Sequence, residues 1–198
     1  MNQLQVFPDA QKLAEAAVQQ SLDILRESIE AHDVAVWVLA GGTAPLLAYK
    51  HIAESYLDAI DWSKITFLIG DERIGALDSP DNNWHAIDEL FLRHIPQATF
   101  MRPPTDQPAE QAADDYEKQL SVLPQAKPGL PRLDLVWLGM GEDGHTLSLF
   151  PNNQAVAETT RLVTPVHDTP KPPVDRISLT LQALAGAEQA MILTSGQS

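Results

Sequence analysis

Two side chains in the second half of the chain could carry out acid–base chemistry. Asp143 and His145 lie in the segment 138–151, LGMGEDGHTLSLFP, in which three glycines follow an apolar run. Glycine-rich turns let the backbone approach a ligand closely, and an imidazole beside open N–H groups suits general-base catalysis. A helix cap or a satisfied buried ring is the alternative for a lone histidine, but the glycine context favours a functional His145.

The same segment contains a pattern that is typical of nucleotide binding. Its glycines spell G-x-G-x-x-G, which is a weak signal by itself. Glu142 and Asp143 would place negative charge where a pyrophosphate binds. The next strand-like run, 161–166, does not end in the acid that dinucleotide sites carry about 20 residues on. We therefore do not predict a nucleotide site here.

A second candidate site is an anion-binding turn earlier in the chain. Gly41, Gly42 and Thr43 lie just before a predicted helix that starts at Pro45, with Ala44 between. Free N–H groups at a helix N-terminus, with no Cβ in the way, attract phosphate or carboxylate groups. The Gly-Lys-Ser/Thr ending of a Walker loop is absent. A tight turn that needs glycine conformations explains the two glycines equally well.

Charged residues follow a third apolar run. Ile65–Ile69 is followed by Gly70 and then by the charged triplet Asp71, Glu72 and Arg73. Asp71 could abstract or relay a proton, and Arg73 could bind a phosphate or carboxylate through two parallel hydrogen bonds. A surface cluster in which Arg73 pairs with Asp71 or Glu72 is the alternative. Asn82, further along, is expected to cap the next helix.

Two cations in a proline-rich loop complete the set. Lys171 and Arg176 lie close together in a chain with only 13 Lys+Arg; ordinary solvated charge is the alternative, and Arg176 is the better candidate. With the glycine turn and Arg73, they suggest a phosphorylated substrate. A histidine without a neighbouring serine or cysteine nucleophile suggests attack by water. We expect no metal, because the sequence has no His pair at i, i+4 and no Cys/His cluster.

These residues need secondary-structure elements that bring them together. Helical spacing of apolar residues predicts helices over 14–29, with Asp9 as N-cap, and over 45–55, 83–94 and 109–120. Short apolar runs predict strands over 34–39, 65–69, 99–101, 133–138, 161–166, 177–181 and 190–194, with a loop at 124–131. This alternation favours an α/β fold with a mainly parallel sheet, whose ligands bind beyond the carboxyl ends of the strands.

Composition limits the class of protein. The chain has 198 residues, 44% of them hydrophobic, and a net charge of −14. The size suits one domain over residues 1–198, and the charge repels nucleic acid and anionic membranes. We expect a cytoplasmic protein, because the sequence shows no cysteine, no signal peptide and no membrane-spanning run. Because the sequence stops just after its last predicted strand, we expect the domain to lack its C-terminal helix.

The motifs LAGGTAP, FLIGDER, NNW, LGMGEDGHTLSLFP and RISLTLQAL resemble, in this order, those of the 6-phosphogluconolactonases. The resemblance implies a Rossmann-like modified, mainly parallel sheet with helices on both faces. It also implies cofactor-free hydrolysis of 6-phospho-D-glucono-1,5-lactone in the oxidative pentose phosphate pathway, by water that His145 activates. Asp71 and Arg73 would be the other catalytic residues. The substrate contacts that it implies are Gly41, Gly42, Thr43, Arg73, Asn83, Gly141, Gly144, Lys171 and Arg176.

Two other functions stay open at this point. Glucosamine-6-phosphate deaminases/isomerases share this fold and resemble the chain at Asp71, Asp143 and His145. They carry a glutamate shortly after the histidine, whereas Ser148–Pro151 contains no acid. A non-catalytic phosphosugar sensor would keep the phosphate site and lose the base. The small phosphosugar lactone is the partner that we expect, bound to a monomer or a weak homodimer.

Overall fold

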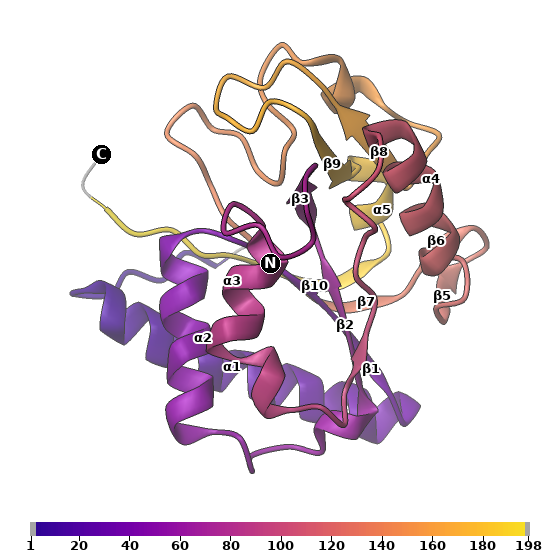
Figure 1. The fold of residues 1–198 in the computed structure, drawn as a ribbon. Coiled ribbons are helices and arrows are strands. Elements are labelled where there is room, and N and C mark those ends of the chain that lie inside the picture. The colour runs from indigo at the N-terminus through magenta and orange to yellow at the C-terminus, as the bar shows by residue number, and fades with distance from the viewer. Residues whose placement is uncertain (1–2, 197–198) are drawn as a thin grey trace.

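A five-stranded parallel sheet forms the centre of the computed structural model, which describes residues 3–196 (Figure 1). Its strand order is β10–β7–β1–β2–β4, and an antiparallel sheet, β3–β9–β8, and a hairpin, β5–β6, lie outside it. The predicted fold class is confirmed. The strands are β1 (Ala35–Leu39), β2 (Ile65–Ile69), β3 (Asp71–Arg73), β4 (Thr99–Phe100), β5 (Gln125–Lys127), β6 (Leu130–Pro131), β7 (Leu133–Leu138), β8 (Val163–Val166), β9 (Arg176–Leu179) and β10 (Ala187–Ile192).

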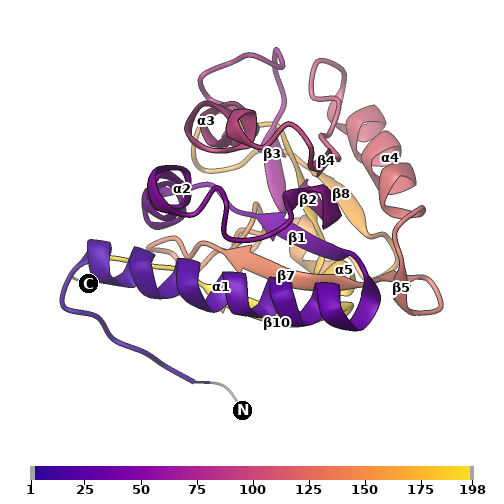
Figure 2. The same cartoon turned by 90° about the horizontal axis from the view of Figure 1, so that it is seen from below.

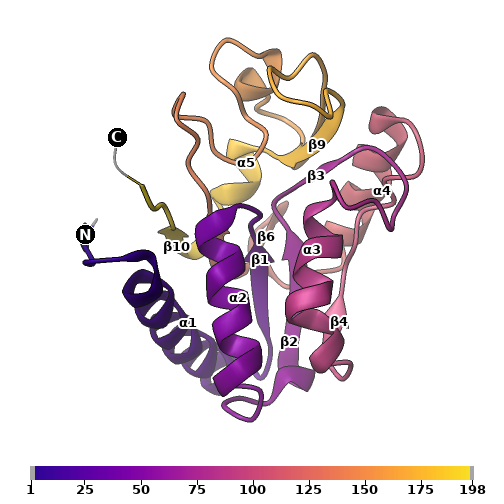
Figure 3. The same cartoon turned by 60° about the vertical axis from the view of Figure 1, so that its left-hand side comes forward.

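Helices flank the central sheet. In sequence order, α1 (Ala10–His32), α2 (Thr43–Ser55) and α3 (Asn83–Leu90) lie next to one another (Figures 2 and 3). α4 (Ala109–Leu120) packs against β8 and β9, and the short α5 (Leu181–Leu184) follows β9. Single 3-10 turns occur at Trp62–Lys64, Leu92–His94 and Gln154–Ala157.

The first helix shows how the pattern of apolar residues becomes packing. Asp9 accepts a hydrogen bond from the backbone N–H of Lys12 at 2.8 Å, which confirms the predicted N-cap. The residues of α1 that face the sheet are spaced three or four apart, and their burial anchors the helix. They include Ala14, Val18, Leu22 and Leu25, all fully buried.

The strand order brings the three predicted loops together. β7, β1 and β2 are neighbours and run parallel, so the loops that follow them meet at one edge of the sheet. Two buried tyrosines fix this edge. Tyr49 of α2 hydrogen-bonds both N and O of Ala40, at 3.0 and 3.1 Å. Tyr116 of α4 bonds N and O of Ile69, both at 2.9 Å. Burial raises the pKa of both hydroxyls, so each stays protonated and can donate.

The chain passes from one sheet into the other at Gly70. The Gly70 N–H donates to the Leu39 carbonyl at 2.9 Å, and the Gly70 carbonyl accepts from Leu179 N at 2.8 Å. A Cβ at Gly70 would lie 2.5 Å from the side chain of Leu147, so a larger residue here would displace that side chain. Because β3 starts at the next residue, its side chains stand beside the carboxyl ends of the parallel strands.

Several predicted elements differ from the structure. The predicted loop 124–131 contains the hairpin β5–β6, and residues 71–73 form a strand, β3. The predicted strand 177–181 ends earlier, because Thr180 accepts a hydrogen bond from Ala183 N and caps α5. The strands at 161–166 and 177–181 pair antiparallel with each other outside the parallel sheet.

Two sequence expectations concern the chain as a whole. The expected lack of a C-terminal helix depends on Ser198, which lies outside the described residues, and it stays a prediction. Within residues 3–196, no helix has both the length and the apolar character needed to cross a membrane.

Candidate active site

A pocket of about 170 Å³ lies where the loops after β7, β1 and β2 meet β3 and β9. It brings together eight of the predicted site residues: Gly41, Gly42, Asp71, Arg73, Asn83, Gly141, His145 and Arg176. Ala40, Gly139, Met140, Thr146 and Leu147 complete its lining. Three predicted residues of the described part of the chain do not line it: Thr43, Gly144 and Lys171.

His145 is held by the acid that lies two residues before it. Its Nδ1 lies 2.5 Å from Oδ1 of Asp143, and only 16% of its side chain is exposed. The hydrogen bond from His145 lowers the pKa of Asp143, so this carboxylate stays ionised and accepts the Nδ1 proton. Nε2 then keeps its lone pair, and within residues 3–196 no group hydrogen-bonds it. This arrangement is that of a general base with an orienting acid.

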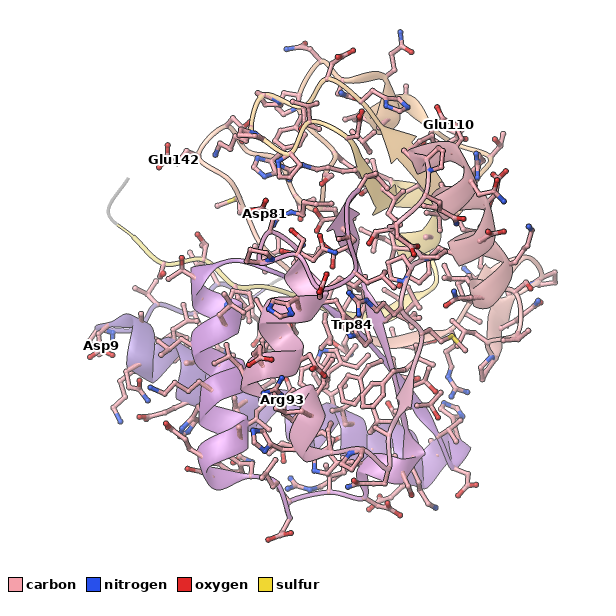
Figure 4. The ribbon with its side chains drawn as sticks, viewed as in Figure 1. Asp9, Asp81, Trp84, Arg93, Glu110 and Glu142 are labelled. Atoms are coloured by element: carbon pink, nitrogen blue, oxygen red, sulfur yellow. The ribbon has the colours of Figure 1, made fainter. Side chains whose placement is uncertain are left out.

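The loop that carries His145 depends on one close approach. A Cβ at Gly141 would lie 2.2 Å from both Cε1 and Nδ1 of His145, so only glycine leaves room for the ring. The Gly141 N–H donates to the carbonyl of His145 at 2.9 Å. Glu142 is exposed and points away from the molecule at the tip of the loop (Figure 4). The alternative of a helix cap for His145 is wrong, because no helix begins at this loop.

An aromatic ring connects the imidazole of His145 with a cation. The centroids of the Phe150 and His145 rings lie 4.2 Å apart, and the Arg176 guanidinium lies over Phe150 at 5.5 Å. Phe150 is buried, so it presents an apolar wall at this point. The sequence analysis did not single out Phe150, because an aromatic residue in an apolar run usually indicates only a core position.

Two arginines face each other across the antiparallel sheet. Arg73 of β3 is the register partner of Arg176 of β9, an arrangement in which like charges repel. Burial, and then the charge of Arg73, lower the pKa of Arg176. Arg176 donates to the carbonyls of Pro173 and Lys171 at 3.0 and 2.9 Å. Paired guanidinium groups that use carbonyls as partners are suited to hold an anion between them.

Arg73 does not form the predicted surface cluster. Its Nη1 donates to the backbone carbonyl of Asp81, and its buried Nε has no partner among the described residues. The alternative in which Arg73 forms an ion pair with Asp71 or Glu72 is therefore wrong. Strand alternation explains why: Asp71 and Arg73 point to the same face of β3, and Glu72 points to the other.

Asp71 is tied to a serine that the sequence analysis did not single out. Its Oδ2 accepts a hydrogen bond of 2.6 Å from Ser148, which is fully buried. The Ser148 hydroxyl also accepts a weak bond from Arg176 at 3.5 Å. The hydroxyl thus connects the carboxylate of β3 with the guanidinium of β9.

The predicted anion-binding turn is only partly in place. Gly41 and Gly42 line the pocket, whereas Thr43 starts α2 with an exposed side chain. A Cβ at Gly41 would lie 2.1 Å from Oδ1 of Asn83, so the two residues are in close contact. Asn83 also donates to the carbonyl of Asp71 at 3.0 Å. The turn therefore presents glycine backbone to the pocket beside an asparagine side chain.

The predicted capping role of Asn82 is wrong. Asn82 occupies the N-cap position of α3 but makes no side-chain capping bond. Its Nδ2 donates to Ala76 O and Thr105 Oγ1, at 3.1 and 3.3 Å. The cap comes from Glu72, whose oxygens accept from the first two N–H groups of α3. The sequence carries little signal for such a cap, because the acceptor Glu72 lies 11 residues before Asn83, the first residue of the helix.

No cluster of three or more His, Cys, Asp or Glu side chains within the described part of the chain could hold a metal ion. The pocket itself brings the imidazole of His145 next to the guanidinium groups of Arg73 and Arg176.

Comparison with known proteins identifies relatives over nearly the full length. Residues 8–198 match the sequence model of the family described as glucosamine-6-phosphate isomerases/6-phosphogluconolactonase. The 6-phosphogluconolactonases of Mycobacterium leprae and Mycobacterium tuberculosis are each 33% identical to this chain, over 98% of it and 81% of their own length. The solved structure of 6-phosphogluconolactonase from Trypanosoma brucei superimposes with a TM-score of 0.87 at 30% identity, covering 97% of this chain and 81% of that one.

Proposed function

The chain belongs to the family of glucosamine-6-phosphate isomerases and 6-phosphogluconolactonases, and we propose that it is the lactonase, which hydrolyses 6-phosphogluconolactone in the pentose phosphate pathway. The relatives described above carry that name. The observation that carries the proposal is the pocket in which His145, with Nε2 open, lies near two facing arginines.

The geometry suggests a role for each group in the reaction. Nε2 of His145 takes a proton from water, and the oxygen of that water bonds to the lactone carbonyl carbon. Asp143 stabilises the imidazolium that forms. When the bond between this carbon and the ring oxygen breaks, the imidazolium returns the proton to the leaving oxygen. The products are a carboxylic acid and a hydroxyl group, which balance lactone plus water.

The two arginines supply the positive charge that a phosphorylated substrate needs in a chain with a net charge of −14. Arg73 and Arg176 would hold the phosphate and stabilise the oxyanion that develops on the carbonyl oxygen. Asn83 and the backbone of Gly41, Gly42 and Gly141 would contact sugar hydroxyls. Asp71, fixed by Ser148, would accept a hydrogen bond from one of these hydroxyls.

The deaminase alternative requires a further acid beside the histidine. The ring of Phe150 packs against His145 instead, and an apolar ring cannot transfer the proton that opening of the sugar ring needs. A sensor without a base is not supported by the His145–Asp143 pair. The lactonase is thus the function that these side chains support best.

The test measures hydrolysis of freshly generated 6-phosphogluconolactone, with the spontaneous rate subtracted. We expect the protein to accelerate hydrolysis, and we expect EDTA to have no effect, because the proposed reaction uses no metal. Folded protein that does not exceed the spontaneous rate would overturn the proposal. Glucosamine 6-phosphate, tested in parallel, should not be turned over, and release of ammonia from it would indicate the deaminase.

Cellular location and assembly stay predictions. We expect the protein in the cytoplasm, as a monomer or weak homodimer without nucleic-acid or membrane partners. Light scattering coupled to size-exclusion chromatography would measure the mass in solution.

A further inference from the structure

Glu72 is a buried carboxylate that the proposed reaction does not use. It is 1% exposed, on the face of β3 opposite to Asp71 and Arg73. All of its hydrogen bonds come from backbone N–H groups. Oε1 accepts from Arg73 N at 2.9 Å and from Asn83 N at 2.8 Å, and Oε2 accepts from Trp84 N at 2.7 Å.

Two of these three donors belong to residues that line the pocket. Arg73 carries one of the guanidinium groups, and Asn83 starts α3 and contacts Gly41. Trp84 lies in the first turn of this helix, and Asp81 lies just before it (Figure 4). The carbonyl of Asp81 accepts a hydrogen bond from the Arg73 guanidinium. A single carboxylate therefore connects β3 with α3 directly and with the turn after β1 through Asn83.

We propose that Glu72 is a positioning residue for the proposed hydrolysis: its carboxylate fixes the backbone of Arg73 and Asn83, so that the guanidinium and the amide face the substrate together. This inference rests on the proposed function only for the identity of the substrate. The positive end of the α3 dipole favours a carboxylate at this place.

The charge state of Glu72 is set by several groups that face it. Burial raises its pKa to about 7, although the three N–H groups oppose the rise. Asp71 raises the pKa further from its own strand. Arg176 on β9 and Tyr116 on α4 are the other titratable groups whose pKa values its charge affects. A protonated Glu72 has one acceptor oxygen fewer for the same three donors, so the positions of Arg73 and Asn83 should loosen below about pH 7.

A competing effect has the opposite sign. The negative charge of Glu72 weakens the positive potential of the two arginines, so removal of this charge by itself would strengthen the binding of an anion. Among the influences on the pKa of Arg176, Glu72 is the smallest, after burial, Arg73 and Asp71. We therefore expect the loss of hydrogen-bond geometry to decide the outcome.

The experiment compares Glu72→Gln with Glu72→Asp. In the glutamine variant, an NH₂ group replaces one acceptor oxygen and faces a backbone N–H donor. The aspartate variant keeps the negative charge, but its side chain is one CH₂ group shorter and no longer reaches the three N–H groups. Both should weaken 6-phosphogluconate binding and raise KM on the order of tenfold, as expected for lost hydrogen bonds to a charged acceptor, with a smaller change in kcat. Asp9→Asn is the matched control, because it removes a carboxylate from the N-terminus of α1 and should change neither value.

Affinity within twofold of wild type in both folded variants would overturn the proposal. Absence of lactonase activity in the wild type would instead overturn the proposed function. Should neither variant fold, sulfate binding to the His145→Ala protein gives the answer, since sulfate keeps its charge and no imidazole titrates at position 145. Its affinity should fall as the pH drops below about 7, and a constant affinity from pH 5.5 to 8.5 would contradict the role of Glu72.

Discussion

The two sheets contribute different chemistry to one pocket. The parallel sheet provides loops after its strand ends, with glycine backbone from Gly41 and Gly42 and the imidazole of His145. The antiparallel sheet provides charge directly from its strands, through Asp71, Arg73 and Arg176. We propose that the parallel sheet supplies the base and the room for the substrate, whereas the antiparallel sheet supplies the charges that bind it.

The largest effect should follow a change on the parallel side. Replacing His145 with alanine removes the base, so kcat should fall by ~10²–10⁴-fold. Affinity for 6-phosphogluconate should stay within a few-fold of wild type, because the arginines are untouched. Steady-state kinetics and titration calorimetry measure the two quantities. If kcat survives, His145 is not the base, and the division between the two sheets fails.

The next largest effect should come from the antiparallel side. Arg176→Ala and Arg73→Ala should each weaken 6-phosphogluconate binding about 10- to 100-fold, since a hydrogen bond to a charged group contributes ~1.5–3 kcal/mol. Arg93→Ala serves as the control, because Arg93 lies in the turn after α3 and forms exposed ion pairs with Asp88 and Glu89 of that helix. Unchanged affinity in both pocket variants would mean that the charged sheet does not bind the phosphate.

The sequence predicts the two sheets unequally well, for physical reasons. The bounds of β2, β7 and α4 match the predicted runs residue for residue, because continuous apolar runs and helical spacing are local signals. β3 has only three residues, all charged, and it becomes a strand by pairing with β9, about 100 residues further on. No local pattern contains that information.

The same contrast holds for the side chains of the site. The sequence predicts His145, Gly41 and Gly42 as site residues, because glycines just after an apolar run indicate a turn at the end of a strand. Glu72 and Ser148 are not predicted, since their roles depend on the face to which a strand residue points and on a partner distant in sequence. The facing of Arg73 and Arg176 follows from strand register, which the sequence does not specify.

Glu72 lies where the two sheets join, and its burial predicts a dependence of stability on pH. Its pKa in the folded protein, about 7, lies above the 4.5 of an ordinary glutamate. The folded state thus binds more protons, and the stabilisation present below pH 4.5 is lost as the pH rises through 7. Glutamine does not titrate, so Glu72→Gln lacks this loss. Between pH 5 and pH 8, the free energy of unfolding of wild type should therefore fall by on the order of 2 kcal/mol more than that of Glu72→Gln. Urea denaturation at the two pH values measures the difference. A parallel response of both proteins would contradict a raised pKa.

The smallest effect should come from the loop beyond the antiparallel sheet. The side chain of Lys171 is exposed and does not line the pocket, although its carbonyl accepts from Arg176 at 2.9 Å. That backbone contact survives Lys171→Ala, so KM should change less than about twofold, as for most exposed charges. Lys118→Ala on α4 is the control. If Lys171→Ala raises KM by far more, and the increase vanishes at high salt, the loop reaches the bound phosphate and the charges of the site extend beyond the two strands.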